Sequence, residues 1–205
     1  MKKNKKEEMD IVFLLDRSGS MGGTEEDTIG GYNSYIKEQK KNNVRVTTVL
    51  FDNEYELLND RTPINSVKNL TRKDYFVRGS TALLDAIGRS INYMDSKKSK
   101  KALFIITTDG YENASREFTK DKIRKMIKSH DNYEFMYIGA DIDSYSEGTS
   151  LGISKNNISS YKKDRKGMSK LFKAASCASD MYYDCCEVGS SWKEELENYI
   201  EENKK

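Results

Sequence analysis

Proline, cysteine and histidine are scarce in this sequence, and long apolar runs are missing. One proline in 205 residues leaves no proline-rich linker. The three cysteines, Cys177, Cys185 and Cys186, form neither a disulfide framework nor a Cys-x-x-Cys metal motif, so we expect buried or partly buried free thiols. The longest apolar runs, at 11–15 and 102–106, have five residues each, whereas a membrane-spanning helix needs about 20. The sequence therefore predicts a single soluble domain and excludes a disulfide-rich secreted scaffold.

Charge is nearly balanced along the chain. Lys and Arg total 35 and Asp and Glu total 33, which leaves a formal net charge of +2. This balance excludes a strongly polycationic nucleic-acid binder and an acidic disordered tail protein. The basic start resembles a secretory signal, but Glu7 and Glu8 follow the lysines at once and the next apolar stretch is too short. We therefore expect a flexible tail at 1–8 and a cytoplasmic protein.

Short apolar runs alternate with segments of helical periodicity in the first two thirds of the chain. The runs are rich in Val, Ile, Phe and Tyr and are bounded by Gly, Asp or Asn, which is typical of buried strands. The segments between them repeat apolar residues every three or four positions, which predicts helices. The predicted strands are 9–15, 44–51, 101–108 and 133–139, and the predicted helices are 28–41, 82–94 and 115–129. Such alternation predicts an α/β fold with a doubly wound, mostly parallel sheet covered by helices on both faces.

Two shorter segments complete the expected sheet at about six strands. Residues 55–58 follow a tight turn and read as an antiparallel edge strand, and 157–161 reads as the last edge strand. The remaining sequence has helical patterns at 167–185 and 192–200. We therefore expect one domain at 9–162, with a helical C-terminal extension at 163–205 packed on the same domain.

Small oxygen-bearing side chains gather in the loops around the predicted strand ends. Asp16, Ser18 and Ser20 follow the first strand at a spacing of two, so they can converge on one point. Thr81 precedes the second long helix, and Asp109 follows the strand at 101–108. Open parallel sheets bind ligands beyond the carboxyl ends of their strands, and hard oxygen ligands without His or Cys favour magnesium, manganese or calcium. Each residue alone also fits an ordinary turn or helix cap, so the conjunction of three loops carries the prediction of a metal site.

These five positions resemble the metal-ion-dependent adhesion site of von Willebrand factor type A domains. The family's Asp-x-Ser-x-Ser falls on Asp16, Ser18 and Ser20. Its loop threonine falls on Thr81 within Gly-Ser-Thr-Ala-Leu-Leu-Asp-Ala-Ile, and its distal aspartate on Asp109 within Thr-Thr-Asp-Gly. The resemblance covers roughly 9–161, implies a Rossmann-like fold, and is nearest to the small stand-alone bacterial or phage version of the domain.

The resemblance implies a binding module rather than an enzyme. The hydroxyls of Ser18, Ser20 and, in some states, Thr81 would contact a Mg²⁺ ion, with Mn²⁺ or Ca²⁺ as alternatives, and Asp16 and Asp109 would act directly or through water. Magnesium prefers six ligands, and mostly neutral ligands leave it attractive to an incoming carboxylate. We therefore expect the ion to bind an acidic side chain of a partner protein, and neither nucleic acid nor a membrane. An AAA-type ATPase or a signalling or stress protein is the candidate partner by family analogy.

Two other functions remain open at this point. A metal-dependent hydrolase or phosphatase could use the same sheet edge, but the sequence has no Asp-x-Asp pair after the first strand, no Gly-x-Ser-x-Gly elbow and no phosphate loop. The single histidine, His130, lies far from the cluster in sequence, so a general base is missing. A structural subunit with a vestigial site is the second alternative, and the complete set of five residues argues against it.

Several residues beside the proposed ligands have less specific roles. Asp52 is expected to serve a turn after the second strand, and Asp85 to be an acidic first-turn residue favoured by the helix dipole. Four neighbours could shape the choice of partner or be exposed loop residues without a special role: Arg17, Met21, Tyr111 and Glu112.

Overall fold

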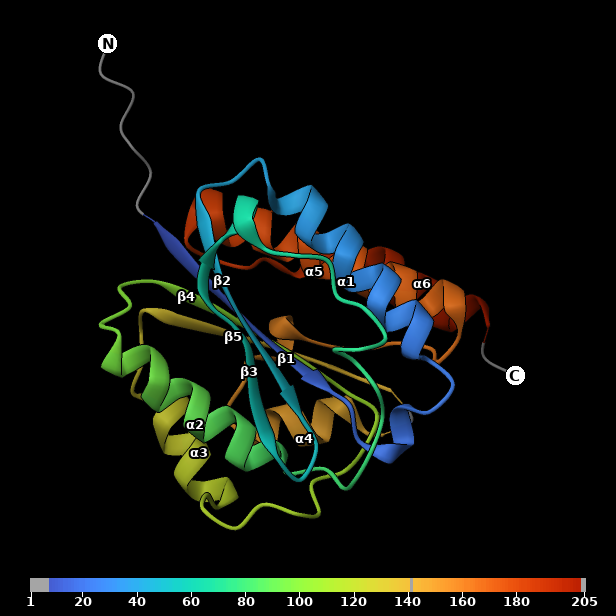
Figure 1. The fold of residues 1–205 in the computed structure, drawn as a ribbon, viewed down its shortest axis with the longest axis horizontal. Helices are drawn as coiled ribbons and strands as arrows, with labels where there is room; N and C mark the ends of the chain where they lie inside the picture. Colours follow the sequence, from blue (N-terminus) through green and yellow to red (C-terminus); the bar gives the residue numbers. More distant parts are fainter. Residues whose placement is uncertain (1–7, 141, 204–205) are drawn as a thin grey trace.

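A six-stranded sheet with helices on both faces forms the protein (Figure 1). The computed structural model describes residues 8–140 and 142–203, so the expected tail lies, except for Glu8, outside the described residues. The strand order is β3-β2-β1-β4-β5-β6, and all neighbours are parallel except β2 and β3, which are antiparallel. This arrangement confirms the predicted α/β fold with one antiparallel edge strand. The strands are β1 (Met9–Asp16), β2 (Val44–Phe51), β3 (Tyr55–Pro63), β4 (Ala102–Thr108), β5 (Tyr133–Gly139) and β6 (Ile158–Ser160).

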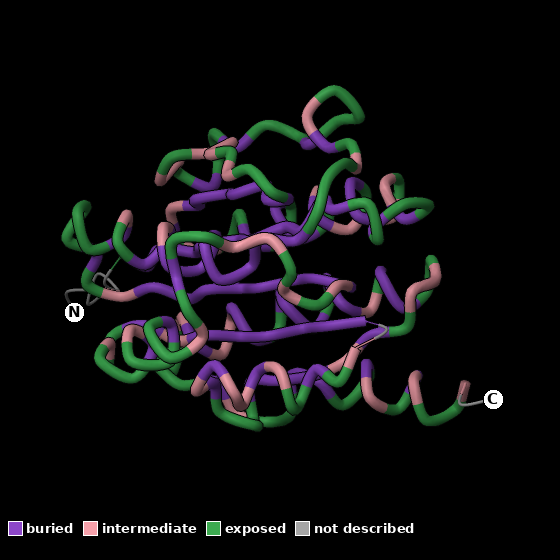
Figure 2. The backbone as a smooth tube through the Cα atoms, turned by 90° about the horizontal axis from the view of Figure 1, so that it is seen from below, coloured by how far each residue is buried: buried purple, intermediate pink, exposed green. Residues whose placement is uncertain are grey.

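The helices form two layers, one on each face of the sheet. Helices α1, α5 and α6 cover one face, and α2, α3 and α4 cover the other (Figure 1). Seen along the sheet, the buried segments lie in the middle layer and the exposed turns of the helices face outward (Figure 2). The helices are α1 (Glu25–Gln39), α2 (Leu83–Ser96), α3 (Lys120–Lys128), α4 (Ser144–Ser150), α5 (Arg165–Cys185) and α6 (Glu194–Glu202).

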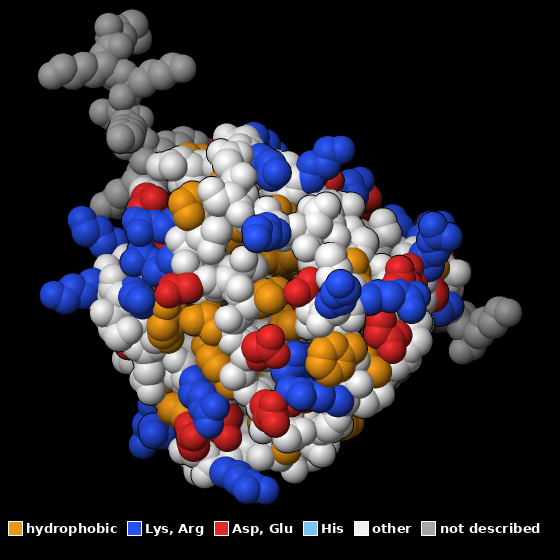
Figure 3. Space-filling view, viewed as in Figure 1, with side chains coloured by type: hydrophobic (Ala, Val, Ile, Leu, Met, Phe, Trp, Pro, Cys, Tyr) orange, Lys and Arg blue, Asp and Glu red, His pale blue; other side chains and the backbone are white. Residues whose placement is uncertain are grey.

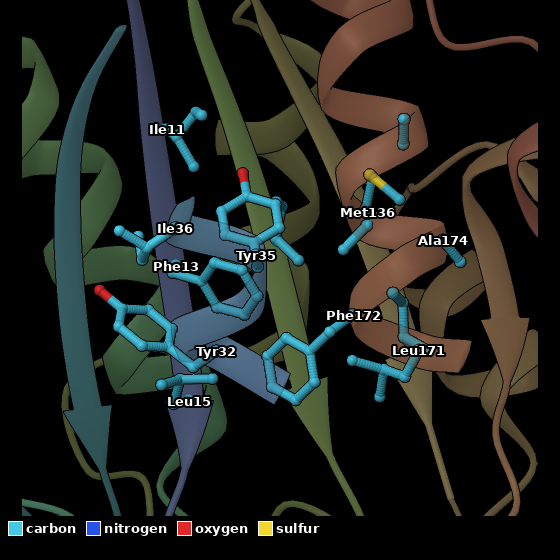
Figure 4. Close-up of a cluster of buried hydrophobic side chains, with 14 of the residues drawn as sticks. Ile11, Phe13, Leu15, Tyr32, Tyr35, Ile36, Met136, Leu171, Phe172 and Ala174 are labelled. Atoms are coloured by element: carbon cyan, nitrogen blue, oxygen red, sulfur yellow. The ribbon is translucent and has the colours of Figure 1, made fainter. Parts of the chain in front are cut away.

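Strand β1 is buried on both faces, as its unbroken apolar run predicts. Its alternate side chains point into two separate apolar clusters, with Phe13 on the side of α1 and α5 and Val12 on the side of α2 and α3. The Phe13 ring packs edge-on against Tyr32 and Tyr35 and is stacked on Phe172, at centroid distances of 5.1 to 5.9 Å (Figure 4). Burial of apolar area on both faces fixes the position of β1 in the centre of the sheet.

Helix α5 packs along α1 over the first face of the sheet. Its N-cap is Asp164, whose side chain accepts a hydrogen bond from the Gly167 amide at 2.7 Å. Ser179 shares a hydrogen bond of 2.8 Å with the Tyr35 hydroxyl of α1. The residues beyond 162 therefore share the apolar cluster of the sheet, to which Leu171, Trp192 and Leu196 also contribute.

Two elements differ from the sequence prediction by five residues at one end, more than the others do. Helix α3 begins at Lys120 rather than at 115, because the preceding segment is held as a loop: Asp85 accepts the amides of Arg116, Glu117 and Phe118. Asp85 therefore anchors this loop, beyond its expected first-turn role. Strand β3 extends to Pro63 rather than ending at 58, and its side chains are half-buried or exposed, as suits an edge strand.

Candidate metal centre

Asp16 ends β1 at the carboxyl edge of the sheet, and its side chain is buried. Its two carboxylate oxygens accept different hydrogen bonds, from the Ser18 amide to Oδ1 at 2.7 Å and from the Thr108 hydroxyl to Oδ2 at 2.6 Å. Burial raises the pKa of Asp16 to about 6, and these hydrogen bonds offset part of that rise. The Tyr75 hydroxyl donates to the Asp16 backbone carbonyl at 2.6 Å. The carboxylate is thus fixed in orientation, and a nearby cation would stabilise its charged form.

The serines of the first loop connect Asp16 to the end of β4. The hydroxyls of Ser18 and Ser20 lie 3.0 Å apart, and Ser20 donates its hydroxyl proton to Oδ1 of Asp109. With its proton held by Asp109, the Ser20 oxygen keeps lone pairs free for a cation. The first and third predicted loops therefore meet, side chain to side chain.

Thr81 and Ser20 border the same small space beside Gly110. A Cβ atom placed on Gly110 would lie 3.0 Å from Thr81 Oγ1 and 3.2 Å from Ser20 Oγ. The Thr81 backbone is held there because its amide donates to Asn113 Oδ1 at 2.9 Å. The five predicted residues, from three loops, are therefore gathered at one edge of the sheet, and their assignment as metal ligands stays a prediction.

The donor set fits a hard divalent cation. Oδ2 of Asp109 is buried and has a cationic neighbour, the Lys163 ammonium group at 2.7 Å, so this carboxylate oxygen suits contact with a cation. The remaining donors are hydroxyl groups and the Asp16 carboxylate, which are the ligand types that magnesium and manganese prefer. Within residues 8–140 and 142–203 no group of three His, Cys, Asp or Glu side chains could hold a metal ion, so a metal here depends on hydroxyl ligands.

A partly buried ion-pair network beside the first loop was not anticipated from the sequence. Arg17 is fully buried instead of exposed at the rim, and its Nε donates to Asp52 Oδ2 at 2.9 Å. Arg78 Nε donates to the same oxygen at 2.8 Å. The other carboxylate oxygen of Asp52 accepts the Glu54 amide, which confirms the expected turn role of Asp52. The backbone carbonyl of Asp52 accepts the Ala82 amide at 2.8 Å. Asp52 thus links the loop of Ser18 and Ser20 to the segment that carries Thr81.

The other expected rim residues divide into exposed and inward-facing ones. Tyr111 is 54% exposed. Phe76, which was not anticipated from the sequence, is 45% exposed and packs against the guanidinium groups of Arg17 and Arg78. Met21 is buried, and Glu112 turns toward α2, where it accepts the Leu84 amide at 2.9 Å. Tyr111 and Phe76 are therefore two large apolar side chains that a partner could contact at this edge.

A lysine from the C-terminal part of the chain reaches the same site. Lys163 Nζ lies 2.7 Å from Asp109 Oδ2 and donates to the backbone carbonyl of Ser20. The sequence carries no signal for this contact, because Lys163 sits in a run of charged residues and is remote from both partners along the chain.

The histidine and the cysteines lie away from this site. His130 pairs with Asp95 and stacks on Tyr133, which begins β5, so it lies at the opposite edge of the sheet. Cys177, Cys185 and Cys186 are free, as expected, but all three are exposed on or just beyond α5, where we expected burial. The apolar side of α5 is formed instead by Met168, Leu171, Phe172, Ala175 and Ala178.

A doubly wound sheet with this set of oxygen donors at its carboxyl edge defines a class of ligand-binding α/β domains. The chain belongs to the von Willebrand factor type A family, whose model matches residues 10–174. Domains of this family are adhesion and protein-interaction modules, and some carry a metal ion at the adhesion site. No curated protein sequence matches the chain. In the described part of the chain, no helix combines the length and apolarity needed to cross a membrane.

Solved structures share the fold at low sequence identity. The PilB minor pilin from Streptococcus sanguinis matches with a TM-score of 0.66 and 11% identity, over 88% of this chain and 63% of the pilin. The manganese-loaded TRAP protein of Plasmodium vivax matches with a TM-score of 0.61 and 19% identity, over 82% and 73%. Proximal thread matrix protein 1 of the mussel byssus, with a zinc-occupied adhesion-site motif, matches with a TM-score of 0.60 and 17% identity, over 87% and 46%. The chain thus spans less than two thirds of the pilin and about half of the byssus protein.

Proposed function

We propose that this chain is a metal-dependent protein-binding module that captures an acidic side chain of a partner protein. The observation that carries the proposal is the meeting of three loops around Gly110, where the hydroxyls of Ser20 and Thr81 border one space and Ser20 donates to the buried Asp109 carboxylate. Ser18 and Ser20 would contribute neutral ligands, while Asp16 and Asp109 would orient them and balance the charge. A bound Mg²⁺ ion would supply an open coordination position for the partner's carboxylate.

Magnesium is the proposed ion, with manganese or calcium as alternatives. The donors are all oxygens, which favours a hard cation, and a structural relative was solved with manganese. The byssus protein was solved with zinc in its adhesion-site motif, so the divalent ion differs between these two relatives.

The mixed charge of the surface suits a partner that is held mainly at the metal ion. On the face seen in Figure 3, Lys and Arg side chains are interspersed with Asp and Glu, and the formal net charge of the chain is only +2. Long-range steering by a single-sign field is therefore small. A localised ion would attract the carboxylate, and the exposed rings of Phe76 and Tyr111 would contact the residues that flank it.

The proposal also covers the cellular compartment, the type of domain and the kind of partner. Three exposed free thiols suit a reducing compartment, so we place the protein in the cytoplasm. We also propose that the domain is of the small stand-alone bacterial or phage type. Its proposed partner is an AAA-type ATPase or a signalling or stress protein. The packing of α5 and α6 on the sheet supports treating residues 163–205 as an extension of the same domain.

Thermal unfolding tests the metal site directly. Because a ligand that binds only the folded state stabilises it, millimolar Mg²⁺ or Mn²⁺ should raise the melting temperature by several degrees, about the effect of 1–2 kcal/mol. Asp16→Ala and the milder Ser20→Ala should abolish the rise. Asp121→Ala, at an exposed acidic position in α3, should keep it. An equal rise in Ser20→Ala and in the unmodified protein would refute the assigned site.

A further inference from the structure

Lys163 occupies the part of the site that a metal ion would need. Its ammonium group lies 2.7 Å from Asp109 Oδ2 and also donates to the carbonyl oxygen of Ser20, so it contacts two of the three loops. The Lys163 side chain is 23% exposed, whereas that of Asp109 is 1% exposed. The contact is therefore made at the mouth of the site, with the lysine entering from the solvent side.

The ion pair between Lys163 and Asp109 gives a partner to Oδ2 of Asp109. Oδ1 of Asp109 accepts the Ser20 hydroxyl, while among the described residues Oδ2 has no polar partner apart from the Lys163 ammonium group at 2.7 Å. A buried carboxylate without a partner is strongly disfavoured, so Lys163 stabilises the site when no other cation is there. The neighbouring Lys162 points elsewhere and donates to the backbone carbonyl of Asn203.

The backbone around Lys163 is anchored, so only the side chain is free to leave. Asp164, the next residue, caps α5 through the Gly167 amide and accepts the Tyr199 hydroxyl of α6 at 3.1 Å on each oxygen. A Cβ atom on Gly167 would overlap the Lys162 carbonyl, which shows how closely the first turn of α5 is packed on this segment. The lysine side chain, by contrast, has solvent beside it and several rotatable bonds.

We infer that Lys163 is a tethered cation that competes with the divalent ion for Asp109. The inference rests on the proposed function, since it concerns the same site. Two cations a few ångströms apart repel each other, so the ammonium group must swing into solvent when a divalent ion binds. Without metal, Lys163 thereby neutralises the charge of Asp109. With metal, the competition from Lys163 makes the affinity for the ion lower than the oxygen ligands alone would give. Helix α5 need not move in this exchange, because its cap stays in place.

Direct metal binding to charge-removing variants tests the competition. Titration calorimetry with MnCl₂ alone would compare the unmodified protein with Lys163→Met, with Lys163→Arg, and with Lys162→Met as the matched control. Lys163→Met should bind Mn²⁺ on the order of tenfold more tightly, the scale of removing one like charge from beside the ion in a partly exposed site. Its melting temperature in chelator should fall, because Asp109 loses its partner. Lys163→Arg and Lys162→Met should bind like the unmodified protein.

The outcomes separate this inference from the proposed function. Equal or weaker Mn²⁺ binding by Lys163→Met, with binding by the unmodified protein intact, would overturn the competition and leave the metal-dependent module standing. If Lys163→Met binds Mn²⁺ and the unmodified protein does not, the competition is supported in its strongest form, and the proposed metal dependence of the natural chain is overturned. Absence of binding in both proteins would overturn both.

Discussion

Gly110 leaves a space between the Thr81 and Ser20 hydroxyls because it has no side chain. In Gly110→Ala the new methyl group would lie 3.0 Å from Thr81 Oγ1 and 3.2 Å from Ser20 Oγ, in the space proposed for the ion. The backbone at Gly110 is not left-handed, so we expect a change of at most about 1 kcal/mol in unfolding free energy without metal. The variant should nevertheless lose the rise in melting temperature with Mg²⁺. Differential scanning fluorimetry measures both effects, and a full metal-dependent rise would contradict the placement of the ion.

Residue spacing predicts which side chains gather at the site but not what surrounds them. Asp16, Ser20 and Asp109 could be chosen because each follows a recognisable strand, and parallel strands end at one edge. Arg17 lies inside the same loop motif and was expected at the rim, yet it is fully buried because Asp52, at the end of β2, accepts its hydrogen bond. Lys163 had no signal at all. Contacts between segments far apart in sequence follow from the packed fold, which periodicity does not describe.

At the scale of elements, two adjacent glycines of α1 offer a matched test of helix packing. In Gly31→Ala the new Cβ would overlap the Phe172 ring of α5, and the forced shift should destabilise the protein by about 1–3 kcal/mol. At Gly30 a Cβ meets no atom within 4 Å, so Gly30→Ala should stabilise by up to about 1 kcal/mol through helix propensity. Urea unfolding of the two variants measures the difference. Similar stability changes in both would show that α1 and α5 do not pack as described.

The strands of the central sheet were predictable because their apolar runs are continuous. The bounds of β2 and β5 match the prediction, and β1 and β4 differ by one residue at one end. Helix α3 was predicted too long, because the segment before it has helical spacing but donates its amides to Asp85, some 30 residues earlier in the chain. Strand β3 was predicted too short, because its polar second half pairs with β2 through the backbone and needs no apolar pattern.

At the scale of the whole molecule, the distance of the histidine and the cysteines from the proposed metal site argues against the hydrolase alternative. His130 lies at the sheet edge opposite the proposed site, and the cysteines lie on or just beyond α5. In the described part of the chain neither the imidazole nor a thiol lies near the proposed metal site, so general base catalysis by these groups has no basis. We therefore expect no metal-dependent turnover of generic phosphate or carboxylate esters, measured with chromogenic substrates and Mg²⁺ or Mn²⁺. Robust activity that disappears in Asp109→Ala would overturn the binding-module proposal.

The position of β1 also determines how the molecule would carry mechanical load. This strand runs from the sheet edge opposite the site to Asp16 itself, and β2 and β4 pair with it on either side over most of its length. Tension between a partner held at the site and the chain that precedes Met9 would act along the strand axis. The backbone hydrogen bonds on both sides of β1 would then be loaded in shear and share the force, rather than open one after another.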